Sequence, residues 1–292
     1  MTRYQFITDS ACDIPDDTLE AYPEITMLSI PLVVDGQDKR ERRDFSITGF
    51  YDALEQSKEL PTTAHITMVE FFESYEKAAA RGAGHLVVLT ITSKGSNMHN
   101  AACMAKASFF EEPPALAGKL TIDVIDSRTY TVLYGCALVE AAEMARAGAG
   151  REAVVAHLST IPERMDVYFT IFNLDYAKKS GRIGFAAAFV GELLGLRPVM
   201  TIRNGEVTMV GKVRGDKQVL QKLVDNYKTE ADGDKNHPYA LLYGNREDLL
   251  EELKASLKKA RAPKEKGIYH CGASITINAG PTLVGIIFPR KI

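Results

Sequence analysis

The sequence contains no tryptophan and has few cysteines, none of them with the spacing of a metal site. Its four cysteines include no Cys-x-x-Cys pair and lie far apart, at Cys12, Cys103, Cys136 and Cys271. This distribution favours neither a disulfide framework nor a zinc module, and it suits a reducing compartment. The first residues also lack the apolar stretch and small-residue cleavage site of a signal peptide. We therefore expect a cytoplasmic protein.

Long apolar runs are also missing. The stretch 267–289 has no Asp, Glu, Lys or Arg, but it is interrupted by His270, Asn278, several glycines and Pro281. A helix that spans a bilayer needs about 20 consecutive, predominantly apolar residues, and this stretch does not fit that description. It predicts instead two buried strands around a polar turn. We expect no integral membrane segment.

Neither sign of charge is in large excess. The chain has 35 basic and 38 acidic residues, which gives a formal net charge of −3. A nucleic-acid-binding domain would carry a clear positive excess, so no nucleic-acid partner is expected. The 292 residues, of which 46% are hydrophobic and 25% charged, are typical of an ordered globular chain with about two domains.

Motifs that mark common catalytic sites are absent. The sequence has no Gly-x-Ser-x-Gly elbow, no His-Glu-x-x-His, no phosphate-binding P-loop and no Gly-x-Gly-x-x-Gly. Its six histidines form no pair with convincing metal spacing, so neither a metal nor a cofactor is expected. This favours binding over turnover. One enzymatic alternative stays open, a hydrolase or transferase that uses Ser93 as nucleophile with His65 or His270 as base.

The first half of the chain alternates short β-branched runs with helical patterns. Predicted strands cover Tyr4–Thr8, Ile30–Val34, Leu86–Ile91 and Thr121–Ile125. Predicted helices cover Ser46–Gln56, Thr67–Arg81, Ser96–Phe110 and Thr129–Ala147. Thr67 and Glu70 have the spacing of a capping box at the start of the second of these helices. Such alternation predicts a mostly parallel sheet with flanking helices.

The second half has a different pattern after the Ala-Gly break at 147–150. A hairpin is expected about Asn204-Gly205, a pair that favours tight turns. The other predicted elements are strands at Asp166–Phe172 and Tyr239–Tyr243 and helices at Phe185–Leu194, Asp216–Tyr227 and Glu247–Ala260. We expect two α/β domains, residues 1–155 with the mostly parallel sheet and residues 156–292 with a mixed sheet.

Small polar residues follow three of the predicted strands. They are Asp9-Ser10, the loop Thr92–Ser96, and Asp126-Ser127. In open α/β sheets, ligands bind at the carboxyl ends of the strands. The amides and hydroxyls of Thr92–Ser96, which opens a helix, would then suit an anion. The loop with Thr62 and Thr63 would suit a carboxylate or a phosphate.

The same residues also have a purely structural interpretation. Serine, threonine and aspartate after a strand commonly form turns or cap helices. A second binding alternative is an α/β protein for a small phosphorylated or sugar ligand. The lack of basic residues in the predicted loops speaks against it.

Taken together, the motifs resemble the DegV family of bacterial fatty-acid-binding proteins. Six motifs occur in the family's order from end to end, at 7–15, Pro61-Thr62-Thr63, Thr92-Ser93-x-x-Ser96, Asp126-Ser127, Lys179–Ile183 and Gly280-Pro281. The resemblance implies two α/β domains that hold one long-chain fatty acid in a tunnel at their interface. It implies a carrier rather than an enzyme. In some members a separate fatty acid kinase phosphorylates the carboxylate, and the acyl phosphate feeds phospholipid synthesis.

The resemblance also assigns roles to individual residues. Thr62 or Thr63, together with Ser93, would hydrogen-bond the carboxylate, and Ser96 would line the same turn. Ser10 and Ser127 would shape the floor behind them. Segments Lys179–Ile183 and Phe185–Leu194 would bound the tunnel. A kinase surface is expected near Arg182 and Arg203, and the default oligomeric state is a monomer.

Three motifs depart from the usual family pattern. The residues after the threonines are Ala64-His65-Ile66-Thr67 instead of Ser-Gln-Pro-Ser, and Ser96-Asn97-Met98 replaces Ser-Gly-Thr. Asn278 stands where the family commonly has a histidine before Gly-Pro-Gly, and its amide can still donate a hydrogen bond. These changes bear on the handling of acyl phosphate and on the choice of lipid.

Burial of the acyl chain would dominate the affinity. A chain of about 16 carbons gains roughly 12 kcal/mol of gross transfer free energy, at about 0.8 kcal/mol per methylene, before the costs of ordering. Each charge-assisted hydrogen bond to the head group adds about 1–3 kcal/mol. The head group therefore sets the orientation of the ligand more than its affinity.

Overall fold

A computed structural model describes residues 3–111, 120–189, 195–231 and 234–291. The chain separates into two compact units, each described below by itself. The first consists of Met1–Leu32, Asp38–Asp44 and Thr63–Ile161. The second consists of Val33–Gln37, Phe45–Thr62 and Pro162–Ile292. The second unit thus includes two segments from the early part of the sequence.

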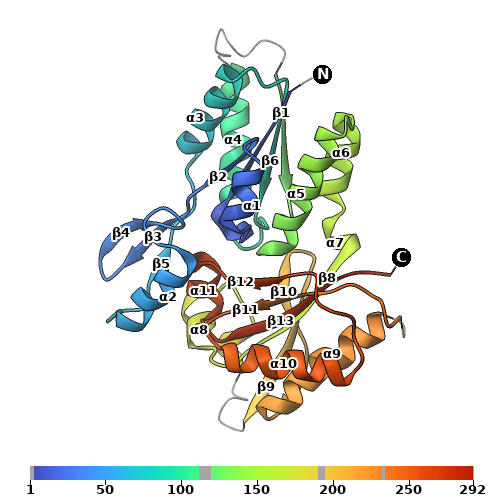
Figure 1. Ribbon diagram of the computed structural model, residues 1–292. Helices are drawn as coiled ribbons and strands as arrows, with labels where there is room; N and C mark the ends of the chain where they lie inside the picture. Colours follow the sequence, from blue (N-terminus) through green and yellow to red (C-terminus); the bar gives the residue numbers. More distant parts are fainter. Residues whose placement is uncertain (1–2, 112–119, 190–194, 232–233, 292) are drawn as a thin grey trace. The chain divides into compact units, whose positions relative to one another are not determined.

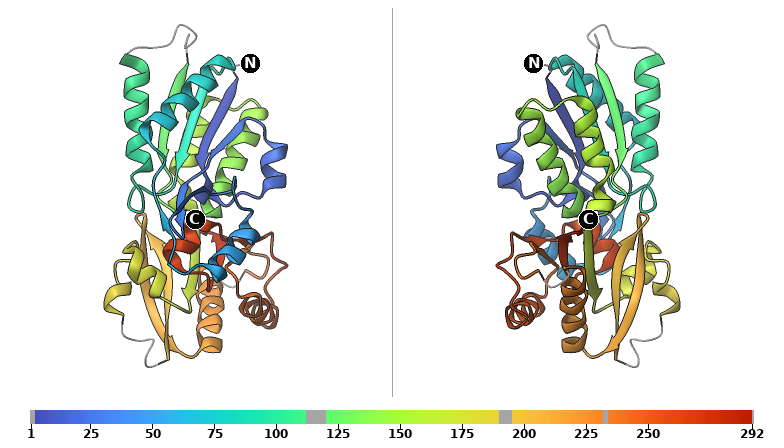
Figure 2. Two further views of the ribbon diagram at one scale, coloured as in Figure 1. Left: turned by 90° about the vertical axis from the view of Figure 1, so that its left-hand side faces the viewer. Right: turned by 90° about the vertical axis from the view of Figure 1, so that its right-hand side faces the viewer.

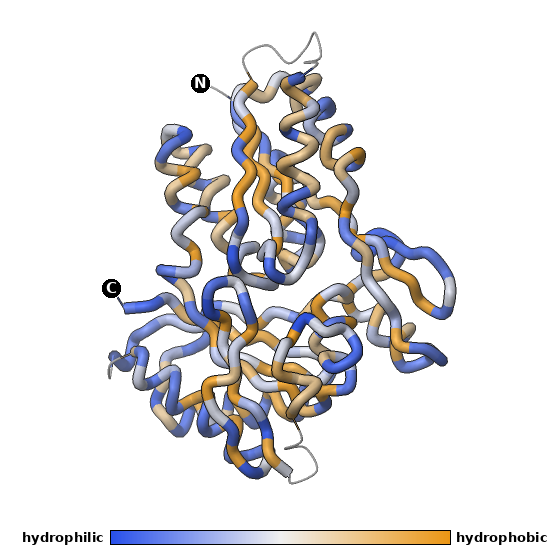
Figure 3. The backbone as a smooth tube through the Cα atoms, turned by 180° about the vertical axis from the view of Figure 1, so that it is seen from behind, coloured by the Kyte–Doolittle hydropathy of each residue, from blue (hydrophilic) through white to orange (hydrophobic). Residues whose placement is uncertain are grey.

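A four-stranded parallel sheet forms the centre of the first unit. Its strand order is β2 (Ile25–Leu28), β1 (Tyr4–Asp9), β6 (His85–Thr90) and β7 (Thr121–Asp126). The predicted parallel sheet is confirmed. Residues Leu86–Leu89 in the middle of β6 are completely buried, as expected for a strand covered on both faces. Figure 3 shows hydrophobic residues along the strands in the middle of this unit.

Helices cover both faces of this sheet (Figure 1 and Figure 2). The pair α3 (Met68–Ala80) and α4 (Met98–Glu111) lies on one face, and the pair α5 (Val132–Arg146) and α6 (Arg151–Ser159) lies on the other. The short α1 (Asp16–Ala21) precedes β2. The predicted capping box is confirmed, because Thr67 accepts from the Glu70 amide while the Glu70 side chain accepts from the Thr67 amide. Of these helices, α1 and α6 are not predicted from the sequence.

One predicted strand belongs to another sheet. The run Ile30–Val34 forms β3 (Pro31–Val34), which lies between β4 (Gln37–Arg40) and β5 (Thr62–Thr63) in a three-stranded sheet. A tight turn explains the difference, since Asp35 and Gly36 adopt φ values of 47° and 74° and join β3 to β4 locally. The segment Ile25–Leu28, which the sequence analysis did not predict, takes the edge position in the parallel sheet.

A six-stranded mixed sheet forms the centre of the second unit, as predicted. Its order is β10 (Glu206–Arg214), β9 (Leu196–Arg203), β8 (Met165–Ile171), β13 (Leu283–Pro289), β11 (Ala240–Tyr243) and β12 (Ile268–His270). β13 is antiparallel to β8 and β11, whereas β11 and β12 are parallel. The predicted hairpin of β9 and β10 is confirmed, with positive φ at Asn204 and Gly205.

The helices of the second unit fall into two groups. α9 (Asp216–Glu230) packs on the sheet and α10 (Glu247–Lys259) packs beside it, and their leucines form much of the buried core. α11 (Ala273–Ala279) contacts α8 (Asp175–Ser180) and α2 (Ile47–Gln56). A single turn, α7 (Ile161–Arg164), precedes β8. No helix in the described ranges is long and apolar enough to cross a membrane.

Two predicted elements of the second unit are corrected by the structure. Between the two strands of 267–289 lies the helix α11 instead of a turn. The predicted helix Phe185–Leu194 is only a 3₁₀ turn at Ala186–Ala188, which ends because Phe189 has an extended backbone (φ −80°, ψ 100°). Residues 190–194 of that prediction lie outside the described part of the chain.

Candidate functional site

Three polar segments meet at one edge of the first unit. Because β1, β6 and β7 are parallel neighbours, their carboxyl ends lie together, and each is followed by one of the predicted segments. The segments are Ser10, which follows Asp9, the loop Thr92–Ser96, and Ser127. The structure thus brings together residues that lie far apart along the chain.

The buried Asp9 carboxylate links three segments at this edge through hydrogen bonds. One carboxylate oxygen accepts hydrogen bonds from the Ala11 amide (3.1 Å) and the Tyr134 hydroxyl (2.7 Å), and the other accepts from the Ile91 amide (2.8 Å). Burial raises the pKa of Asp9 to about 6, although these hydrogen bonds oppose the shift. From the sequence, Asp9 is expected at the ligand edge or in a turn, but its partners on the loop after β6 and on α5 become visible only in the fold.

The backbone amides of the loop after β6 donate hydrogen bonds to the protein itself. All the amides of residues 91–96 donate to groups of the first unit: that of Ser93 to Asp126 (3.1 Å), and those of residues 94–96 to Thr92. The Ser93 side chain, in contrast, is exposed, and its hydroxyl has no hydrogen-bond partner among the described residues. What this loop offers a ligand is therefore a hydroxyl group on a rigid backbone.

Ser96 and Asn97 lie at the start of α4. The Ser96 hydroxyl accepts weakly from the Met98 amide (3.4 Å), and the Asn97 carbonyl accepts from the Ala101 amide (3.0 Å). These bonds give both residues a capping role for the helix. The Asn97 side chain is exposed.

Ser10 and Ser127 are fully buried and already have partners. The Ser10 hydroxyl donates to the buried Glu41 carboxylate (2.6 Å) and accepts from the Ile30 amide (3.0 Å). The Ser127 hydroxyl donates to the Thr129 carbonyl (3.2 Å) and accepts from the Thr129 amide (3.3 Å). Both residues shape the edge from inside, and any contribution to ligand binding acts through the loops that they fix.

The remaining predicted residues are divided between the units. Thr63 belongs to the first unit, whereas Thr62 and Asn278 belong to the second. Thr62 is exposed, and no hydrogen bond of its hydroxyl is present within the described ranges. The Asn278 side chain donates through Nδ2 to the Ser274 backbone carbonyl (2.7 Å) on α11, and the Asn278 backbone carbonyl accepts from the Ser180 hydroxyl (2.9 Å).

An aromatic cluster that the sequence analysis did not predict lies at the carboxyl edge of β11 and β12 in the second unit. The His270 ring stacks between Tyr51 and Tyr243, with both centroids 4.6 Å away and interplanar angles of 7° and 9°. The Tyr51 hydroxyl is bonded to the Cys271 carbonyl (3.1 Å) and the Thr276 hydroxyl (2.8 Å). The sequence suggests a role for His270 only as a base for Ser93, since nothing in the local pattern links it to Tyr51 on α2.

The segment Lys179–Ile183 begins in the last turn of α8 and continues past the end of the helix at Ser180. The Lys179 ammonium donates to the Leu60 carbonyl (3.2 Å), which ties α8 to the chain before β5. Of the two arginines expected at a kinase surface, Arg182 is exposed, whereas Arg203 forms an ion pair with the buried Asp166 (2.9 Å). Asp166 also pairs with Arg290 (3.2 Å), so Arg203 has a structural role in the second unit.

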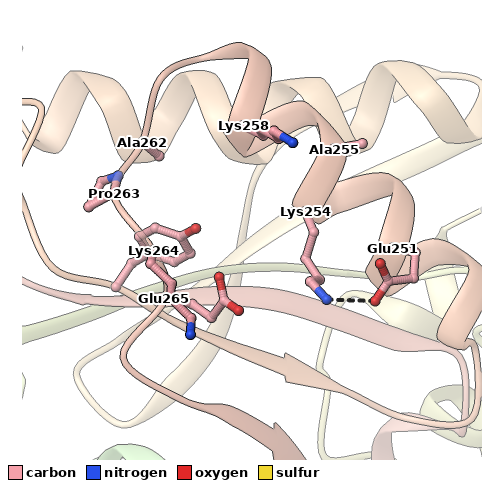
Figure 4. A pocket seen from close by; sticks show the side chains of 9 residues that line it. Glu251, Lys254, Ala255, Lys258, Ala262, Pro263, Lys264 and Glu265 are labelled. Atoms are coloured by element: carbon pink, nitrogen blue, oxygen red, sulfur yellow. Dashed lines mark hydrogen bonds and ion pairs between the residues drawn. The ribbon is translucent and has the colours of Figure 1, made fainter.

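Two surface cavities in the described part of the chain lie away from these residues. One, of about 460 Å³, lies between α10 and the loop that follows it (Figure 4), where Lys254 is paired with Glu251 (2.7 Å). Its walls carry three lysines and two glutamates, so its charge is almost balanced. The other, of about 350 Å³, lies at Arg3–Phe6, the amino-terminal end of β1. Neither cavity is lined by a serine or threonine that was expected to bind the ligand.

Comparison with known proteins agrees with the resemblance seen in the sequence. A family model described as "Uncharacterised protein, DegV family" matches residues 3–291. A DegV domain-containing protein of Caldanaerobacter subterraneus subsp. tengcongensis is 29% identical, over 100% of both chains. A Thermotoga maritima protein named fatty acid-binding protein is 28% identical, over 97% of this chain and 96% of its own.

Solved structures agree as well. A DegV family protein from Thermus thermophilus, described by its fatty acid binding, superposes with a TM-score of 0.85 at 27% identity, covering 99% of this chain and 100% of the other. A Thermotoga maritima protein described as revealing fatty acid binding function superposes with a TM-score of 0.82 at 25% identity, over 100% of both chains. The chain belongs to the DegV family.

Proposed function

We propose that this protein binds one long-chain fatty acid, with the carboxylate held by the hydroxyls of Thr62 and Ser93 and the acyl chain buried. The observation that carries the proposal is the match, over 99% of the chain, to a Thermus thermophilus structure described by its fatty acid binding. The two hydroxyls add support because both are exposed and, within the described residues, neither is engaged by the protein itself.

The chemistry of the two residues suits a carboxylate. Hydroxyl groups donate hydrogen bonds to a carboxylate without the desolvation cost of a buried lysine. The Ser93 amide donates to the Asp126 carboxylate, and the Ile91 amide donates to the Asp9 carboxylate, so the backbone on which Ser93 stands is fixed. A donor on a preorganised loop loses little entropy on binding. Thr63, Ser96, Asn97 and Asn278 would line or support the head-group loops, with Ser10 and Ser127 behind them.

A carrier explains Ser93 better than an enzyme does. In the described part of the chain, no hydrogen bond joins the Ser93 hydroxyl to a histidine, so the base that a hydrolase needs is not in place. We propose a cytoplasmic monomer without a cofactor, whose bound fatty acid is presented to a separate fatty acid kinase. The exposed Arg182 would contact that kinase.

Calorimetric titration of delipidated protein tests this proposal. We expect hexadecanoate to bind one to one, and hexadecanol, which has the same chain without the carboxylate, to bind at least tenfold more weakly. The reason is that hexadecanol loses the charge-assisted hydrogen bonds, worth about 1.5–3 kcal/mol each. Glucose 6-phosphate serves as the control for a phosphate or sugar binder. Binding of glucose 6-phosphate without binding of hexadecanoate would contradict the proposal.

A further inference from the structure

The His270 cluster, defined as His270 with Tyr51 and Tyr243, contains a polar atom that the fold leaves unsatisfied. Nε2 of His270 is buried, and it has no hydrogen-bond partner among the described residues. Leaving a buried polar group unpaired costs free energy, so such an atom in a folded protein requires an explanation. A hydrogen-bonding group of a ligand at Nε2 would provide one.

The state of the ring follows from its other contacts. The imidazole is hydrogen-bonded to the backbone of Gly244, and burial lowers the pKa of His270 below its ordinary value. At neutral pH the ring is therefore uncharged. Because the hydrogen bond to Gly244 favours the protonated ring, we assign the imidazole as the donor in it, which leaves Nε2 as a lone-pair acceptor.

We propose that His270 takes up a proton at Nε2 when a fatty acid binds, and that the resulting N–H donates a hydrogen bond to the ligand carboxylate. The inference rests on the proposed function, and it adds a positioning residue for the head group. The proton comes from solvent, no covalent bond forms or breaks, and dissociation of the ligand returns the proton.

The surroundings of His270 favour this charged state once a carboxylate is present. A tyrosine ring covers each face of the imidazole, and a cation stacked on aromatic faces is stabilised by their π electrons. The Glu247 carboxylate at the start of α10 attracts a positive charge on the ring. Burial raises the pKa of Tyr243, so this neighbour is uncharged at neutral pH. The Cys271 thiol, next in sequence, is buried.

The location is also appropriate for a ligand. Tyr243 and His270 are the last residues of the parallel strands β11 and β12, and the carboxyl ends of such strands are the usual ligand-binding edge of an α/β sheet. The Tyr51 hydroxyl is fixed by the Cys271 carbonyl and Thr276, so the ring that it presents to His270 is held in place.

Titration of wild-type protein with hexadecanoate between pH 6 and pH 8 tests the proposal. We expect uptake of more than half a proton per ligand at pH 7, measured by calorimetry in buffers with different ionisation enthalpies. The substitution His270→Phe keeps an aromatic ring between the tyrosines and removes Nε2. It should weaken binding about tenfold at pH 6, abolish the proton uptake and leave the binding of hexadecanol unchanged.

The substitution His157→Phe, on α6 of the first unit, is the matched control and should retain the wild-type pH profile. His270→Gln keeps a hydrogen-bonding group that does not titrate, and it should bind without proton uptake. If wild-type protein binds hexadecanoate without proton uptake, the inference is wrong whether or not the variants fold. If wild-type protein does not bind hexadecanoate at all, the proposed function fails as well.

Discussion

The substitution Gly244→Ala is expected to lower the free energy of unfolding of the second unit by about 3 kcal/mol, because the added methyl group has no room. A Cβ atom at this position would lie 2.0 Å from the Pro281 carbonyl oxygen and 2.7 Å from its carbonyl carbon. That oxygen already accepts from the Asn245 amide (2.7 Å). Both neighbours are backbone, so the chain itself must move. Chemical denaturation followed by circular dichroism measures the loss.

The matched control is Gly184→Ala in the same unit. Among the described residues, no heavy atom lies within 4 Å of a Cβ added at position 184, and its φ is not positive, so the change in the free energy of unfolding should stay below about 0.5 kcal/mol. Equal stability of the two variants would show that Gly244 is not packed against Pro281 as described.

The double substitution Thr62→Val with Ser93→Ala is expected to weaken the binding of hexadecanoate at least about 100-fold. Each change removes one hydrogen bond to a charged group, worth about 1.5–3 kcal/mol, and 1.4 kcal/mol corresponds to a tenfold change in affinity. Both hydroxyls are exposed and free of partners within the described residues, so their removal should leave the fold intact. Titration of delipidated wild-type and variant protein measures the ratio.

The control for this experiment is Thr208→Val, which removes an exposed threonine hydroxyl from β10. It should bind hexadecanoate like the wild type. Hexadecanol should bind the double variant and the wild type equally, because it has no carboxylate that the two removed hydroxyls could hydrogen-bond. Wild-type affinity of the double variant for hexadecanoate would remove Thr62 and Ser93 from the head-group site.

Elements with strong local signals were predictable from the sequence. The capping box of Thr67 and Glu70 marks the start of α3, and Asn204-Gly205 marks the hairpin of β9 and β10, because both signals depend only on neighbouring residues. α11 was missed for the opposite reason. Its sequence ASITINA contains β-branched residues that are typical of strands, and its contacts with α8 and α2 are formed only in the fold.

The candidate site was predictable only in part. Polar residues after strands indicate a ligand edge, and this is how the sequence placed Ser93 and Ser127 near Asp9. Their partners are not visible in the sequence, since the Asp9 contact with Tyr134 and the stacking of His270 on Tyr51 join distant segments. A local pattern therefore suggests which side chains contact a ligand. It does not distinguish the Ser93 hydroxyl, which has no partner among the described residues, from the Ser10 hydroxyl, which is bonded to Glu41.

The most direct test of the account is mass spectrometry of the organic extract of purified protein. We expect a long-chain fatty acid at about one molecule per chain, which stays bound through purification because the buried acyl chain contributes most of the affinity. A correctly folded protein that yields no fatty acid, and that takes up none when hexadecanoate is added, would contradict it.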